Sequence, residues 1–116
     1  MKLYLHPKCT TCKKAVSYLD KNGFPYEAID ITKNPPSYEE LSRSNASTLK
    51  GMFNTSGMQY REEGIKEKLE DLTKEEALNL LASNGMLVKR PVLVLEDCVL
   101  QGFKEEAWEA ALSTRV

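Results

Sequence analysis

The sequence lacks the long apolar runs, the charge excess and the histidine clusters that mark several classes of protein. No apolar run approaches the ~20 residues of a membrane span. The N-terminus shows no basic region followed by a long apolar stretch, as a signal peptide would. The formal net charge is −1, so no surface for nucleic acid or anionic membrane is expected. We therefore expect a cytoplasmic protein that binds neither directly.

The size and composition are those of an ordinary globular protein. With 116 residues, 41% of them hydrophobic and 28% charged, the chain is expected to form a single domain over residues 1–116 with one modest core. It has only three cysteines, which are too few for a disulfide framework. In a reducing compartment, such cysteines serve redox chemistry or metal binding more often.

Two of the cysteines form a Cys-x-x-Cys motif, Cys9-Thr10-Thr11-Cys12. The residues before it, Met1–Leu5, are typical of a short strand, which Pro7 ends because proline has no N–H for a ladder. After it, apolar residues recur at helical spacing, in the series Cys12, Ala15, Val16 and Leu19. The two thiols are therefore predicted at a strand-to-helix junction.

This position suits a reactive thiolate at Cys9. The first N–H groups of a helix lack partners within the helix and carry partial positive charge, so they stabilise an anion. Nearby lysines add favourable potential, and Cys-x-x-Cys motifs depress thiol pKa values to roughly 3.5–7.5. Cys12 is close enough to attack a disulfide formed on Cys9. We interpret Cys9 as a nucleophile and Cys12 as the resolving thiol.

Three other readings of the motif are less favoured. A structural zinc site needs four ligands, and only Cys98 and His6 remain as soft partners, without a second paired motif. A structural disulfide does not fit a chain without a secretory signal. Two inert cysteines at a helix start would be a coincidence. No metal or organic cofactor is therefore expected.

The first third of the chain predicts a strand–helix–strand unit. The helix is expected over Thr10–Lys21, ending at Asn22-Gly23, and the alternating residues Tyr26–Ile31 predict a second strand. With a helical crossover the two strands should be parallel and the unit right-handed. A Cys-x-x-Cys at the first turn of such a unit indicates a thioredoxin-like redox motif.

The central segment, about residues 37–85, contains no strand candidate and predicts a helical insertion. Two capping boxes, Ser37-x-x-Glu40 and Thr73-x-x-Glu76, each predict a helix start. The first helix is expected to reach about Asn45, and the second to stop near Asn84-Gly85. Between them we expect short helical turns over Leu49–Asn54 and Tyr60–Lys68.

The last third predicts a β-hairpin followed by a helix. Val92–Leu95 is typical of a buried strand, and Cys98–Leu100 is its expected partner, with Cys98 as a buried small hydrophobe. Glu105–Leu112 has the pattern of an amphipathic helix. The predicted fold class is α/β: a thioredoxin-like fold with a mixed sheet of about four strands and an all-helical insertion.

Four features occur together: Cys9-x-x-Cys12 after a strand, Asn34-Pro35-Pro36 before the insertion, Arg90-Pro91 before an apolar strand, and a terminal helix. In this order the whole chain resembles the ArsC/Spx family of thioredoxin-fold proteins. The resemblance implies that Cys9 is the nucleophile, that Cys12 is the second cysteine, and that Arg90 precedes a cis-proline and helps to hold an oxyanion. Pro91, Thr10 and Thr11 are then expected to contact the substrate.

The sequence departs from the arsenate reductases of this family. They use further arginines around the insertion and after the hairpin, whereas this chain offers Lys50 and Arg61 in the insertion and Gly102 after the hairpin. The family also includes Spx-like regulators that bind RNA polymerase. These departures count against arsenate reduction as the activity.

Two functions remain open from the sequence. The first is a thiol-disulfide oxidoreductase or reductase, with arsenate among its candidate substrates and with electrons from thioredoxin or a glutathione-like thiol. The second is an Spx-like redox-sensing regulator in which the Cys9–Cys12 pair controls contact with RNA polymerase. The same two thiols serve both functions, so the motif cannot separate them.

Overall fold

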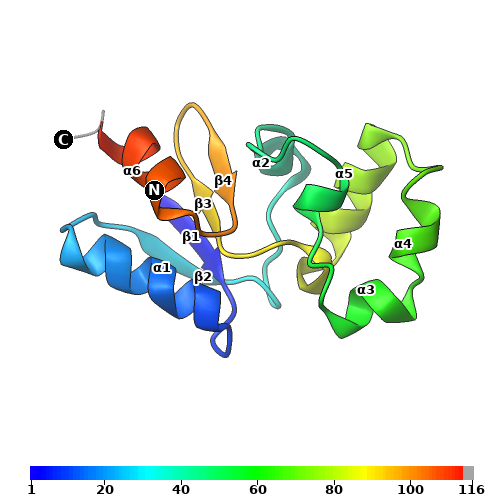
Figure 1. Ribbon diagram of the computed structural model, residues 1–116, viewed down its shortest axis with the longest axis horizontal. Helices are drawn as coiled ribbons and strands as arrows, with labels where there is room; N and C mark the ends of the chain where they lie inside the picture. The colour runs from blue at the N-terminus through cyan, green and yellow to red at the C-terminus, as the bar shows by residue number, and fades with distance from the viewer. Residues whose placement is uncertain (114–116) are drawn as a thin grey trace.

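The computed structural model describes residues 1–113, apart from the side chain of Gln59. A four-stranded sheet occupies the middle of the molecule, with helices on both sides (Figure 1). The strands are β1 (Lys2–Leu5), β2 (Glu27–Asp30), β3 (Val92–Val94) and β4 (Val99–Gln101). The helices are α1 (Thr10–Lys21), α2 (Tyr38–Ser42), α3 (Met58–Glu62), α4 (Ile65–Lys68), α5 (Lys74–Ser83) and α6 (Glu105–Leu112), with short 3₁₀ turns η1 (Lys50–Met52) and η2 (Gly85–Leu87).

The sheet is mixed and has the order β2-β1-β3-β4. β1 and β2 are parallel, because the chain returns through α1, whereas β3 pairs antiparallel with both β1 and β4. This arrangement confirms the predicted α/β thioredoxin-like fold and its sheet of four strands. Among the described residues no helix is long and apolar enough to cross a membrane.

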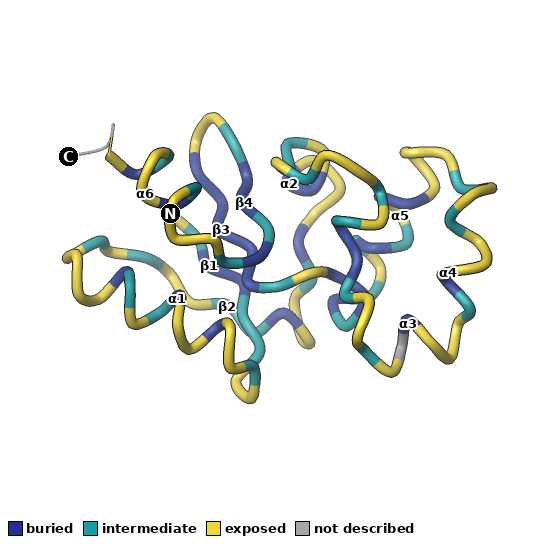
Figure 2. The backbone as a smooth tube through the Cα atoms, viewed as in Figure 1, coloured by how far each residue is buried: buried dark blue, intermediate teal, exposed yellow. Residues whose placement is uncertain are grey.

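Successive residues of a strand point to opposite faces of the sheet, and apolar side chains form a hydrophobic core on each face. In β3, Val92 and Val94 face one core and Leu93 the other, as successive strand residues must. The first core joins the sheet to the segment from α2 to η2, and the second joins it to α1 and α6. The buried parts of the chain follow these two interfaces in Figure 2.

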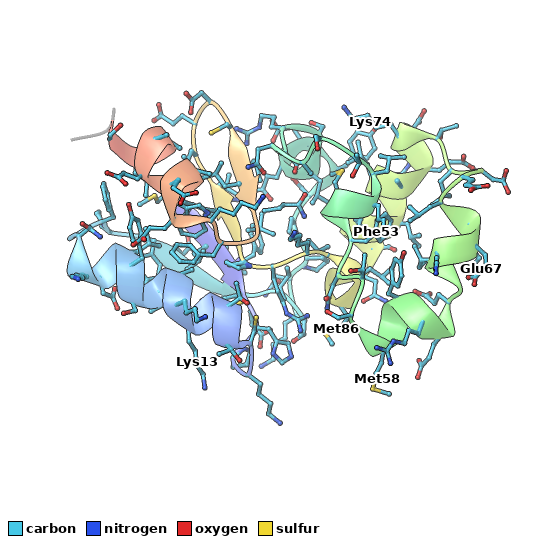
Figure 3. All side chains as sticks on the ribbon, viewed as in Figure 1. Lys13, Phe53, Met58, Glu67, Lys74 and Met86 are labelled. Carbon is cyan, nitrogen blue, oxygen red and sulfur yellow. The ribbon has the colours of Figure 1, made fainter. Side chains whose placement is uncertain are left out.

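The segment from α2 to η2, residues 38–87, is the helical insertion. Both predicted capping boxes form: the Ser37 and Thr73 side chains accept hydrogen bonds from the third helical residues, Glu40 and Glu76, whose carboxylates bind back. Phe53 is fully buried in the insertion, whereas Met58 lies at its surface (Figure 3).

Three sequence predictions need correction. The helix expected to reach Asn45 ends at Ser42, because the backbone of Arg43 and Asn45 pairs with Val99 at the edge of β4. The short helical turns expected over Tyr60–Lys68 begin two residues earlier, at Met58, as the helices α3 and α4, which are divided at Gly64, whose φ of +63° suits glycine. Cys98, expected as a buried strand residue, is only partly buried and precedes β4.

Candidate functional site

Cys9 lies directly before α1 and caps it. Its backbone is extended (φ −86°, ψ 121°), and its Sγ accepts a hydrogen bond from the N–H of Cys12 at 3.4 Å. The turn after β1 brings it there, with the N–H of Cys9 donating to the carbonyl of His6 at 3.1 Å. A negative charge on this sulfur therefore meets the positive end of the helix.

Arg90 comes from the other side of the site, from the loop before β3. The Arg90–Pro91 peptide bond is cis, as the family resemblance implied. Arg90 and Cys9 line the same cleft, and the guanidinium favours a lowered pKa of the Cys9 thiol by hydrogen bonding and by charge. Its Nη1 is buried and has no hydrogen-bond partner within the described residues. Because leaving such a donor unpaired is costly, this atom is suited to bind a ligand.

The pKa values of the two thiols are shifted in opposite directions from the ordinary value of cysteine. Burial raises the pKa of Cys9, but hydrogen bonds from Cys12 and the Arg90 guanidinium outweigh burial and lower it below the ordinary value. Burial raises the pKa of Cys12 to about 12, against a hydrogen bond from the His6 backbone and with a further increase from the Cys9 sulfur. Cys9 is thus the thiol that ionises first.

A cleft of about 640 Å³ opens over Cys9 between the sheet and the insertion. Its walls come from α1, the segment from Thr48 to Ser56, the Arg90 loop and the residues after β4. Four cationic side chains and no acidic ones line it, in a chain that has 17 acidic residues. The cations are Lys50, Lys89, Arg90 and Lys104. Such a concentration of one charge attracts an anionic ligand.

The structure brings together some of the residues singled out from the sequence. Cys9, Arg90 and Thr11 line the cleft, as does Lys50, and Cys12 lies buried beneath Cys9. Thr10 and Pro91 are not among the lining residues: Thr10 is exposed and Pro91 is buried. The roles of all these residues remain predictions.

The cleft residues that sequence reasoning missed include Lys89, Gln101 and Lys104. Lys89 directly precedes Arg90, and Gln101 and Lys104 flank the predicted end of the hairpin. No motif or period separates them from the other polar residues of the chain. Their only signal was proximity to Arg90 and Gly102. Within residues 1–113, no group of three or more His, Cys, Asp or Glu side chains could hold a metal ion.

Comparisons with known proteins identify the family of the chain. The uncharacterized protein YusI of Bacillus subtilis is 47% identical over 109 residues, which span 91% of this chain and 92% of that protein. A solved structure from Streptococcus mutans, described as a "possible arsenate reductase", is 45% identical, has a TM-score of 0.82 and covers 93% of this chain and 96% of its own. The global transcriptional regulator Spx of Listeria innocua is 26% identical, over 98% of this chain and 88% of its own. The ArsC family matches residues 4–111, and the chain belongs to this family.

Proposed function

We propose that this protein is a cytoplasmic thiol-based reductase in which Cys9 attacks, Cys12 resolves and Arg90 binds the anionic part of the substrate. The observation that carries the proposal is the buried, unpartnered Nη1 of Arg90 beside a thiol of lowered pKa. A structural arginine would be expected to use its buried donors on the protein.

The first step is attack by the Cys9 thiolate. On a disulfide R–S–S–R′ it forms the mixed disulfide Cys9–S–S–R and releases R′–S⁻. The helix N-terminus and Arg90 favour the ionised form of this sulfur. Nη1 of Arg90, with the cleft lysines, supports the proposal because these groups would orient an oxyanion or carboxylate next to the sulfur.

The second step is attack by Cys12 on Cys9. Part of the increase in the Cys12 pKa comes from the Cys9 sulfur. Once Cys9 is in a mixed disulfide, that sulfur carries no charge, and this part disappears. Cys12 then loses its proton more easily, attacks the Cys9 sulfur and releases R–S⁻. The product is a Cys9–Cys12 disulfide, and the two thiols have supplied the two electrons.

The electrons are returned by thioredoxin or a glutathione-like thiol, through exchange with the Cys9–Cys12 disulfide. Arsenate belongs to the same reaction class, because its reduction to arsenite takes the same two electrons. The likeness to the Streptococcus mutans protein favours arsenate. The size of the cleft favours a larger anionic partner, since 640 Å³ lies in the range of sites for whole organic ligands.

The similarity to Spx supports a second candidate function. A regulator would use the Cys9–Cys12 pair as a switch, forming the disulfide under oxidation and changing its contact with RNA polymerase. The Spx relative matches 98% of this chain, and a regulator would need a partner surface, which we place in the insertion. Such a protein would need no turnover.

A turnover assay separates the two functions. Arsenate and a small model disulfide are each offered to the protein with thioredoxin or glutathione as the reductant, and NADPH consumption is followed through the matching reductase. Cys9→Ser should abolish turnover, Cys12→Ser should stall with the substrate thiol bound to Cys9, and Cys98→Ser, a cysteine outside the cleft, should leave the rate unchanged.

Turnover that depends on Cys9 would establish a reductase and identify its substrate. Absence of turnover with every pair, together with a Cys9–Cys12 disulfide that forms and reduces reversibly, would overturn the reductase. Stoichiometric RNA polymerase recovered with the protein from a cell extract would then favour the regulator.

A further inference from the structure

The side-chain amide of Gln101 lies where three segments of the cleft wall meet. Its Nε2 donates to the carbonyl of Met52 at 3.1 Å and to that of Lys89 at 3.2 Å. Its Oε1 accepts from the hydroxyl of Ser44 at 2.6 Å. Gln101 is the last residue of β4 and is partly buried. One amide thus joins the end of β4 to the segment after α2, to η1 and to the Arg90 loop.

The same contacts hold the backbone on both sides of Arg90. Before it, the N–H of Lys89 donates to Met52 at 3.0 Å, and the carbonyl of Lys89 accepts from Gln101. After it, the carbonyl of Pro91 accepts from the N–H of Gly102 at 2.8 Å. Lys89 is therefore bound to both the insertion and the end of β4, and Pro91 is bound to the residue that follows β4.

The guanidinium itself is held less firmly than its backbone. Its Nη1 has no hydrogen-bond partner among the described residues, and no carboxylate of that part of the chain forms an ion pair with it. Its direction toward Cys9 thus depends largely on where the backbone places it. A shift of the Lys89 carbonyl would change the position of the guanidinium relative to the sulfur.

We propose that Gln101 is a positioning residue: by binding the carbonyls of Met52 and Lys89, its amide holds Arg90 against Cys9 and couples this placement to the insertion. The proposal rests on the proposed role of Arg90 toward Cys9. Gln101 is uncharged, so it cannot change the ionisation of Cys9 by a charge of its own. The charged side chains that line the cleft around Cys9 are Arg90, Lys50, Lys89 and Lys104, with the thiol of Cys12 beneath.

The test measures the ionisation of Cys9 and needs no substrate. The rate of alkylation by iodoacetamide is followed against pH in a Cys98→Ser background, with the modified peptide identified by mass spectrometry. Gln101→Met keeps the size of the side chain and removes its donors. We expect it to raise the pKa of the Cys9 thiol and to slow alkylation below that pKa by roughly threefold, with the alkaline plateau unchanged.

Ser44→Ala is the matched control, because it removes the bond to Oε1 and leaves both Nε2 bonds. It should leave the pH profile as in the parent. In an Arg90→Met background, Gln101→Met should have no further effect, since a residue that acts through Arg90 cannot act without it. Circular dichroism checks that each variant is folded. If Gln101→Met does not fold, Gln101→Asn replaces it, because it keeps an amide that is too short to reach both carbonyls.

An unchanged profile in a folded Gln101 variant would overturn the proposal. So would an equal shift with and without Arg90, which would indicate a general loosening of the site. If the wild type turned over no substrate, the proposed reductase function would be overturned. The alkylation result would still decide whether Gln101 positions Arg90.

Discussion

The two faces of the sheet are covered in different ways. On one face, α1 and α6 have 12 and 8 residues and pack through a regular apolar stripe. On the other, the insertion uses helices of four and five residues, with only α5 reaching 10. Isolated helices that short do not form in water, so those of the insertion depend on the core they share with the sheet.

The cleft lies where these two regions meet. The first region supplies the thiols from the start of α1, and the insertion supplies the opposite wall with Lys50 and the segment from Phe53 to Ser56. Arg90 lies in the connection that returns from the insertion to the sheet. The reactive group thus sits on a regular element, whereas the ligand-facing wall depends on tertiary contacts. Four substitutions test this contrast.

Gly85→Ala should have the largest effect, because it acts where the insertion meets the sheet. A Cβ at this position would lie 1.8 Å from the carbonyl oxygen of Ile31, a backbone atom that cannot move away alone. We expect a loss of about 3 kcal/mol or more in the free energy of unfolding, measured in urea. Gly51→Ala, whose Cβ would meet the Thr48 hydroxyl at 3.2 Å, should cost far less. Equal losses would contradict this account.

Glu40→Gln should come second, because Glu40 ties α2 to β1. This buried carboxylate pairs with Lys2 and accepts hydrogen bonds from the Tyr4 hydroxyl at 2.8 Å and the Ser37 N–H at 3.0 Å. We expect a loss of about 2 kcal/mol at pH 7. Glu39→Gln removes an exposed ion pair with Arg43, and it should lower the free energy of unfolding by only about 0.3 kcal/mol.

The effect of Glu40→Gln should also depend on pH. Burial raises the pKa of Glu40, but its bonds to Lys2, Ser37 and Tyr4 lower it below the ordinary 4.5. A carboxyl with a lowered folded pKa stabilises the protein above its unfolded pKa, and this contribution is lost as the pH falls through the folded value. The difference between wild type and variant should therefore narrow below about pH 4.5. A constant difference would show that charge is not involved.

Arg90→Met should have a smaller effect, directed at Cys9. Removing the guanidinium removes the contribution of one of the two residues, Cys12 and Arg90, whose interactions lower the pKa of this thiol. We expect alkylation of Cys9 below its pKa to slow by about tenfold, which corresponds to about 1.4 kcal/mol. Arg61→Met, on α3 and outside the cleft lining, should not change the rate. A faster alkylation in Arg90→Met would show that the guanidinium does not favour the thiolate.

Lys50→Met should have the smallest effect, because this lysine acts on the ligand from the insertion side. We expect the KM for an anionic substrate to rise about threefold with kcat unchanged, and the increase to shrink at high salt as screening weakens the wild-type attraction. Lys66→Met, an exposed lysine of α4 outside the cleft lining, is the control. Equal effects of the two would indicate only a change in overall charge.

Much of the fold could be predicted where a local pattern is complete. The bounds of α1 and α6 match the structure, and both capping boxes start helices where expected. The prediction was wrong where a distant segment competes for the backbone: α2 ends early because Arg43 and Asn45 bind Val99, more than 50 residues away. The local sequence around α2 contains no signal that Val99 will take these backbone hydrogen bonds.

In the candidate site too, some residues could be predicted from the sequence and others could not. Cys9, Cys12 and Arg90 could be named because a motif, a helix start and a family resemblance mark them. Lys89, Gln101 and Lys104 could not, because only the return of the chain around the cleft gathers them with Lys50. A single lysine in a sequence is typical of a solvated surface, and only its neighbours in space give it another role.

The sequence by itself determined which thiol sits at a helix start, because hydrogen bonding and dipole at that position follow from a few neighbouring residues. It also determined the order of helices and strands, but it predicted one core, whereas the structure forms a core on each face of the sheet. Only the tertiary structure decided that four cations surround Cys9 and that Gln101 links the insertion to the Arg90 loop. Charge and hydrogen bonding between distant segments depend on distances in space, and the packing of the two cores sets those distances.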